Sequence, residues 1–84
     1  MTLTYDEALK EEKRLYDLLK DVCVEDLWLS NERLFVRVRG DWKHDHLRCQ
    51  YLLEEDKYQI KSKFVVEEDG SDWYTADYYF RRVA

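Results

Sequence analysis

The feature that most constrains the fold is a change of hydrophobic spacing that occurs twice along 84 residues. Residues 5 to 20 repeat apolar side chains at the spacing of an amphipathic helix, and residues 24 to 39 alternate apolar and polar side chains as strands do. Weaker helical spacing returns over residues 42 to 55, and alternation returns between residues 58 and 80. The order helix, hairpin, helix, hairpin (αββαββ) predicts an α+β fold.

The first helix has a defined start and one unusual residue on its apolar face. Thr4 and Glu7 match a capping box, in which the Thr4 hydroxyl accepts from the Glu7 amide and Glu7 reaches back. Glu12 lies within the apolar face, where an unpaired acid would be costly if buried. We interpret Glu12 as paired with an Arg or His of the sheet, such as His46, or as lying on a wetter helix edge. A buried general acid is the alternative.

The first hairpin is predicted to turn at residues 30 to 33. Pairing Leu29 with Leu34 places Asp26 opposite Arg37 on one face of the hairpin, where a cross-strand charge pair helps. The same register gathers apolar side chains on the other face, because side chains alternate along a strand. This predicted core face consists of Leu27, Leu29, Leu34, Val36 and Val38.

The second hairpin is predicted to turn through a three-residue loop, residues 68 to 70, with Gly70 in the left-handed region. A two-residue turn at Asp69 and Gly70 would mix charged and apolar side chains on both faces. The three-residue loop instead pairs Lys61 with Asp77 on the open face. On the core face it pairs Tyr58 with Phe80, Ile60 with Tyr78, Ser62 with Ala76 and Phe64 with Tyr74.

Each helix and each hairpin has an apolar surface that cannot be buried alone. The simplest arrangement is a four-stranded antiparallel sheet with both helices on one face. A chain of this length supports a single modest core, so we expect residues 1 to 84 to form a single domain. The short similarity between residues 15 to 21 and residues 50 to 56 does not establish that the two units are a true repeat.

The composition disfavours several classes of protein. Hydrophobic residues make up 45% of the chain and aromatic residues 15%, too much for a disordered protein despite 39% charged residues. A formal net charge of -5 disfavours a broad phosphate-binding surface, because nucleic-acid affinity depends on clustered Lys and Arg. No apolar run exceeds three residues, so we expect no signal peptide, no membrane span and a cytoplasmic location.

Residues 40 to 46, GDWKHDH, combine residue types that are common in metal and catalytic sites. In a helix, residues two apart point to opposite sides, so His44 and His46 would not bind one ion together. His46 and Cys49 are three residues apart and would share one face of the helix, so they are the candidates for metal ligands. With Glu12 they would form the centre of a metal-dependent enzyme, which is one alternative function.

We favour a structural interpretation of the same stretch. Gly40 ends the first hairpin, Asp41 caps the second helix, Trp42 anchors that helix in the core, and His46 lies beside the core. Neither Cys23 nor Cys49 belongs to a CxxC motif, and we expect both to be reduced. Glycine-rich phosphate loops and the GxSxG and HExxH motifs are absent from the sequence. We therefore expect a protein that is not an enzyme and needs no cofactor.

Aromatic residues dominate the last strand, SDWYTADYYFRR. The predicted register uses three of its five rings in the core and leaves the others on the open sheet face, where Tyr and Trp are typical of protein interfaces. Single-stranded nucleic acid is the alternative ligand, with bases on the rings and Arg81 and Arg82 on phosphates. The candidate partner-binding residues are Trp28, Phe35, Arg37, Arg39, Trp73 and Tyr79.

Two stretches within residues 36 to 80, VRVRGDWKHDHLRCQYLLEE and VVEEDGSDWYTADYYF, resemble small uncharacterised proteins encoded on bacterial phages and conjugative elements. The phrases GDWKHDH and EEDGSDWY carry the resemblance. It implies an accessory protein of a mobile element, such as an inhibitor that binds host machinery, and no particular activity. The resemblance, the aromatic residues of the open sheet face and the missing enzyme motifs together predict a non-enzymatic protein-interaction module that binds a partner protein or itself.

Overall fold

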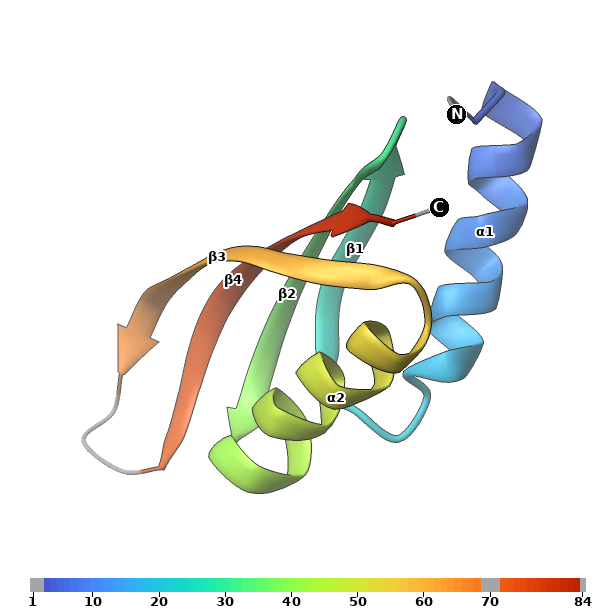
Figure 1. Cartoon of the computed structure of the whole chain (residues 1–84). Helices are drawn as coiled ribbons and strands as arrows, with labels where there is room; N and C mark the ends of the chain where they lie inside the picture. Colours follow the sequence, from blue (N-terminus) through green and yellow to red (C-terminus); the bar gives the residue numbers. More distant parts are fainter. Residues whose placement is uncertain (1–2, 69–71, 84) are drawn as a thin grey trace.

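The computed structural model describes residues 3–68 and 72–83. Figure 1 shows the arrangement of its helices and strands. In chain order the elements are α1 (Tyr5–Leu18), β1 (Val24–Ser30), β2 (Arg33–Asp41), the π-helix η1 (Trp42–Leu47), α2 (Arg48–Glu55), β3 (Tyr58–Glu68) and β4 (Trp73–Arg82).

The four described strands form one antiparallel sheet in the order β1-β2-β4-β3. β1 and β2 form the first hairpin and β3 and β4 the second, and the hairpins are joined by pairing of β2 with β4. The α+β class and the four-stranded antiparallel sheet with two helical segments are therefore confirmed.

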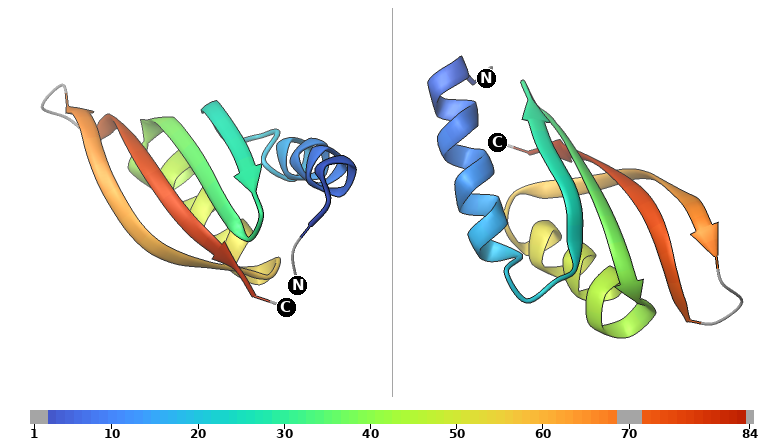
Figure 2. Two further views of the ribbon diagram at one scale, coloured as in Figure 1. Left: turned by 90° about the horizontal axis from the view of Figure 1, so that it is seen from above. Right: turned by 180° about the vertical axis from the view of Figure 1, so that it is seen from behind.

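The two helical segments lie differently against the sheet. Figure 2 shows α2 across one face, whereas α1 runs beside β1 at the edge of the sheet. Side chains of α1 bond to the β1 backbone: Glu12 accepts from the Leu29 amide at 2.8 Å, and the Tyr16 hydroxyl donates to the Leu27 carbonyl at 3.3 Å. The prediction of two helices stacked on one face is not confirmed for α1. No helix in the described ranges is long and apolar enough to cross a membrane.

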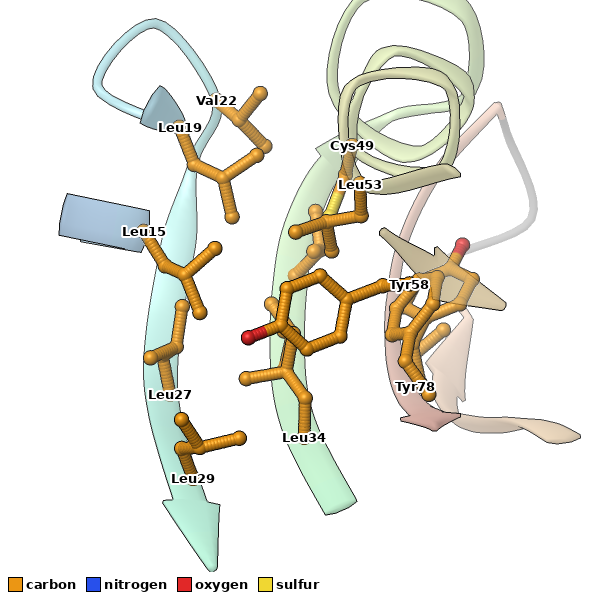
Figure 3. Packing of buried hydrophobic residues seen from close by; sticks show 14 residues of the cluster. Leu15, Leu19, Val22, Leu27, Leu29, Leu34, Cys49, Leu53, Tyr58 and Tyr78 are labelled. Atoms are coloured by element: carbon orange, nitrogen blue, oxygen red, sulfur yellow. The ribbon is translucent and has the colours of Figure 1, made fainter. Parts of the chain in front are cut away.

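Among the described residues, one cluster of buried side chains joins α1, α2 and all four strands (Figure 3). The core face predicted for the first hairpin is confirmed, with Leu27 and Leu29 of β1 only 4% and 6% exposed. The register that aligns them, Leu29 opposite Leu34, is also confirmed. The cluster contains Leu15, Leu19, Val22, Leu27, Leu29, Leu34, Val36, Val38, Cys49, Leu53, Tyr58, Ala76, Tyr78 and Phe80.

Both helix starts follow the predicted caps. Glu7 donates its amide to the Thr4 hydroxyl at 3.2 Å, and the Thr4 amide donates to the Glu7 carboxylate at 3.0 Å. Asp41 accepts from the His44 amide at 2.9 Å at the start of η1. Trp42 is not the core anchor that we predicted, because the residue is 36% exposed and its ring lies beside the ammonium group of Lys63, 4.7 Å from the ring centroid.

The register predicted for the second hairpin is wrong. Tyr58 pairs with Arg82 rather than with Phe80, and Asp77 pairs with Phe64 rather than with Lys61. The register shifts between residues 60 and 62 and again between residues 65 and 67, because each β-bulge adds a residue to β3 without a partner on β4. The tip of the predicted loop, residues 69 and 70, lies outside the described residues.

Candidate functional site

The sheet face opposite α2 carries no helix in the described part of the chain (Figure 2). Its side chains form rows across the strands, because residues paired across antiparallel strands point to the same side. In one row Trp28 of β1 pairs with Phe35 of β2, and Phe35 pairs with Tyr79 of β4. This open face is where the sequence placed the partner-binding residues.

Four aromatic rings form a continuous strip across the open face, one from each strand. Ring centroids are 5.4 Å apart between Trp28 and Phe35, 5.2 Å between Phe35 and Tyr79, and 5.9 Å between Tyr79 and Phe64. Phe35 in the middle is only 7% exposed, whereas the other three rings are 38% to 59% exposed. We call Trp28, Phe35, Tyr79 and Phe64 the aromatic strip.

The structure brings together only part of the predicted set. Trp28, Phe35 and Tyr79 are in contact, but Trp73 lies six positions before Tyr79 on β4, about 20 Å away at the rise of a strand. Phe64 joins the strip instead of the core, because the β3 bulge turns it to the open face. Sequence reasoning missed Phe64, since a bulge leaves no clear mark in an alternating pattern.

The two predicted arginines lie on the open face, and both are paired with acids. Arg37 binds the Asp77 carboxylate through two nitrogens at 2.7 and 3.0 Å, and these hydrogen bonds raise the pKa of Arg37. Arg39 lies 3.7 Å from Glu25. Their positive charges are therefore largely balanced within the protein.

The end of the open face near the β1–β2 turn is positively charged, in contrast to the paired arginines at the opposite end. A hollow of about 610 Å³ lies beyond the aromatic strip, at the β1–β2 turn. Three of its lining side chains are basic and one is acidic. The hollow is lined by Asn31, Glu32, Arg33, Lys61, Ser62, Tyr79, Phe80 and Arg81. We call it the basic hollow.

His46 is fully buried and makes hydrogen bonds through both ring nitrogens. Nε2 lies 2.9 Å from the Tyr74 carbonyl oxygen and 3.2 Å from that of Gly40, so it carries the proton. Nδ1 accepts from the Tyr78 hydroxyl at 2.7 Å. The imidazole also stacks on the Tyr74 ring at 3.9 Å. His46 thus joins the start of the second helix to β2 and β4, and neither nitrogen is left to bind a metal.

The other residues of the suggested metal or catalytic centre lie elsewhere. Cys49 is fully buried, and desolvation raises its pKa to about 12, so the reactive thiolate is strongly disfavoured. Glu12 bonds to the Leu29 amide, so its predicted pairing with His46 or an arginine is wrong. Cys23 and Cys49 are both free thiols. The described residues contain no group of three or more His, Cys, Asp or Glu placed to bind a metal.

Asp45 is a buried residue of the GDWKHDH stretch that the sequence did not single out. It is 5% exposed, and its two carboxylate oxygens accept from the Cys23 amide at 3.0 Å and the Asp41 amide at 2.8 Å. Asp45 thereby ties the loop after α1 to the end of β2. The stretch forms a structural junction, as predicted, with Asp45 and His46 as its buried members.

Comparisons with protein-family models, with curated proteins and with solved structures find no match to this chain. The functional interpretation therefore depends on the open face itself.

Proposed function

We propose that the protein is a protein-interaction module whose open sheet face receives an apolar surface of a partner protein. The aromatic strip carries this proposal. Trp28, Tyr79 and Phe64 are each more than one third exposed and are fixed by mutual ring contacts. Rigid, partly exposed aromatic side chains bury a large area with little loss of conformational entropy, which is why they are enriched among binding hot spots.

Single-stranded nucleic acid is supported less well by the same face. A base needs a free ring face to stack on. Here Trp28 and Phe35 stack on each other with 21° between their planes, and Phe64 meets Tyr79 edge to face at 81°. Arg37 is also paired with an acid, and the net charge of the chain is -5. These features favour a protein surface over a polyanion.

A role as an accessory or inhibitor protein of a mobile element is a narrower proposal. It has the sequence resemblance of residues 36 to 80 as its only support. Identifying the bound partner would test it directly.

Site-specific photo-crosslinking tests the proposed function. One form of the protein carries p-benzoylphenylalanine in place of Tyr79, and a control form carries it in place of Tyr51, which is 59% exposed on α2. We expect a discrete protein adduct in cells from position 79 only. Excess wild-type protein should compete for that adduct, whereas a Trp28→Asp variant should not. Equal adducts from both positions, no protein adduct at position 79, or adducts with nucleic acid alone would contradict the proposal.

A further inference from the structure

The basic hollow reverses the charge of the molecule locally. Arg33, Lys61 and Arg81 line it together with one acid, Glu32, which gives a local charge of +2 by subtraction. The whole chain carries -5. Positive charge is therefore concentrated beside the aromatic strip in a chain that is acidic as a whole.

The cations are held close together by the strand register. Arg33 of β2 is directly opposite Arg81 of β4, and like charges in that position destabilise a sheet. Glu32 lies 3.6 Å from Arg81 and offsets part of this repulsion. Among the described residues, neither Arg33 nor Lys61 forms an ion pair with an acid. A bound anion would relieve the repulsion, so the arrangement favours an anionic ligand.

The positive region extends toward the β3 edge of the sheet. A second, smaller hollow of about 280 Å³ shares Lys61, Arg81 and Glu32 with the first and adds Arg82. Lys61 lies in the first β3 bulge, between the paired residues Ile60 and Ser62. The two hollows together offer room for more than one anionic group along one short path.

We propose that the basic hollow binds side-chain carboxylates of an acidic segment in the partner protein, next to apolar side chains that contact the aromatic strip. This inference rests on the proposed function and names the chemistry of the partner. Arginine guanidinium groups pair with carboxylates through two parallel hydrogen bonds. Tyr79 belongs both to the aromatic strip and to the wall of the hollow, so one bound segment can contact both.

The charge pattern favours carboxylates over a nucleic-acid backbone. A phosphate backbone needs cations repeated along its path. On the side of the aromatic strip away from the hollow, the next row of the sheet contains Asp26 and Asp77 on either side of Arg37. Farther along the same face, Glu25 lies beside Arg39. A nucleic-acid strand crossing the face would leave the positive hollow and meet these acids.

A titration followed by NMR tests the inference. Isotopically labelled protein is titrated with a blocked peptide of alternating glutamate and leucine and, separately, with an oligothymidylate of equal charge. We expect the peptide to shift the amide signals of Arg33, Lys61, Ser62 and Arg81 saturably. Lys61→Gln and Arg33→Gln should each weaken peptide binding about fivefold. These exposed residues can be changed without disturbing the core, and the NMR spectrum of each variant verifies its fold.

Lys43→Gln is the matched control, because Lys43 is an exposed lysine on η1. It should leave peptide binding unchanged. Peptide affinity that is unchanged in Lys61→Gln and Arg33→Gln would overturn the inference, and so would tighter binding of oligothymidylate than of the peptide. Concentration-dependent shifts of the same amides without peptide would assign the hollow to a second copy of the chain. Any of these three outcomes, combined with a persisting crosslink from position 79 to a partner protein, would contradict the carboxylate site and leave the proposed interaction module supported.

Discussion

Gly40 illustrates how closely single groups are fitted where β2 meets the second helix. A Cβ atom on Gly40 would overlap the carboxylate of Asp45, which accepts from the amides of Cys23 and Asp41. We predict that Gly40→Ala lowers the free energy of unfolding by about 2–4 kcal/mol, because the added methyl displaces this acceptor from two amides. Urea denaturation measures the change.

A double-mutant cycle separates this steric cause from a general effect on β2. When Asp45→Ala has already removed the carboxylate, Gly40→Ala should cost at least about 1 kcal/mol less than in the wild type. The same cost in both backgrounds would show that the overlap with Asp45 is not the reason why residue 40 is glycine.

His46 makes stability depend on pH. Desolvation in the core lowers the pKa of His46 below its ordinary value of 6.5. The unfolded chain therefore binds this proton more readily, so the contribution of His46 to stability is complete above about pH 6.5 and is lost as the pH falls below it. We predict a falling urea midpoint from pH 7 to pH 5. His46→Gln should remove most of this fall, and His44→Gln, at an exposed position, should retain it.

The sequence predicted the direction of His46 but not its partners. Helical spacing identified the inward position, because that depends on neighbours a few residues away. The partners are Tyr74 and Tyr78, which follow His46 by 28 and 32 residues and lie on strand β4. They could be placed only with the correct pairing of β2 and β4, which local patterns do not determine.

Among the elements, α1 has a role that differs from simple packing on the sheet. An edge strand has unpaired backbone groups that can pair with another chain. Glu12 and Tyr16 bond to the backbone of β1 at Leu29 and Leu27, so α1 covers part of that edge. An acid that appeared out of place on an apolar helix face therefore has a backbone amide as its partner.

Replacing Glu12 tests this role of α1. Glu12→Ala should lower the free energy of unfolding by about 1–2 kcal/mol, because the Leu29 amide loses its acceptor. Hydrogen exchange at the Leu29 amide should also become faster. Glu12→Gln keeps a carbonyl acceptor and should have a smaller effect. Lys13→Ala, at the next and exposed position of α1, is the control; unchanged Leu29 exchange in Glu12→Ala would contradict the assignment.

The β3 strand marks the limit of prediction at the level of elements. The hairpin pairing of β3 with β4 was predicted, and Tyr58, Tyr78 and Phe80 are buried as expected. The register failed because two bulges each add one residue that alternation counts as an ordinary strand position. One consequence is that Phe64 moved from the predicted core to the aromatic strip.

At the scale of the whole molecule, the two helix-hairpin units are joined closely. β2 pairs with β4 through nine residue pairs, and both units supply side chains to the same core. Arg14 of α1 bonds to Glu11 at 2.8 Å and to Asp56 at 2.6 Å, and Tyr58 donates to Glu11 at 2.8 Å. The hydrogen bonds that Glu11 accepts from Arg14 and Tyr58 lower its pKa to about 2, with Arg14 the largest cause. Each unit on its own would therefore expose the side chains that it contributes to this shared core.

We therefore predict that the two units unfold in one cooperative transition. Trp28 reports on β1 of the first unit and Trp42 on the start of the second helix. One double variant, Trp42→Phe with Trp73→Phe, keeps Trp28 as the sole tryptophan; the other, Trp28→Phe with Trp73→Phe, keeps Trp42. Within each variant, the fluorescence midpoint in urea should coincide with the midpoint from far-ultraviolet circular dichroism, which follows both units together. An earlier fluorescence transition in either variant would mean that its unit unfolds separately, because the shared core would not couple the two.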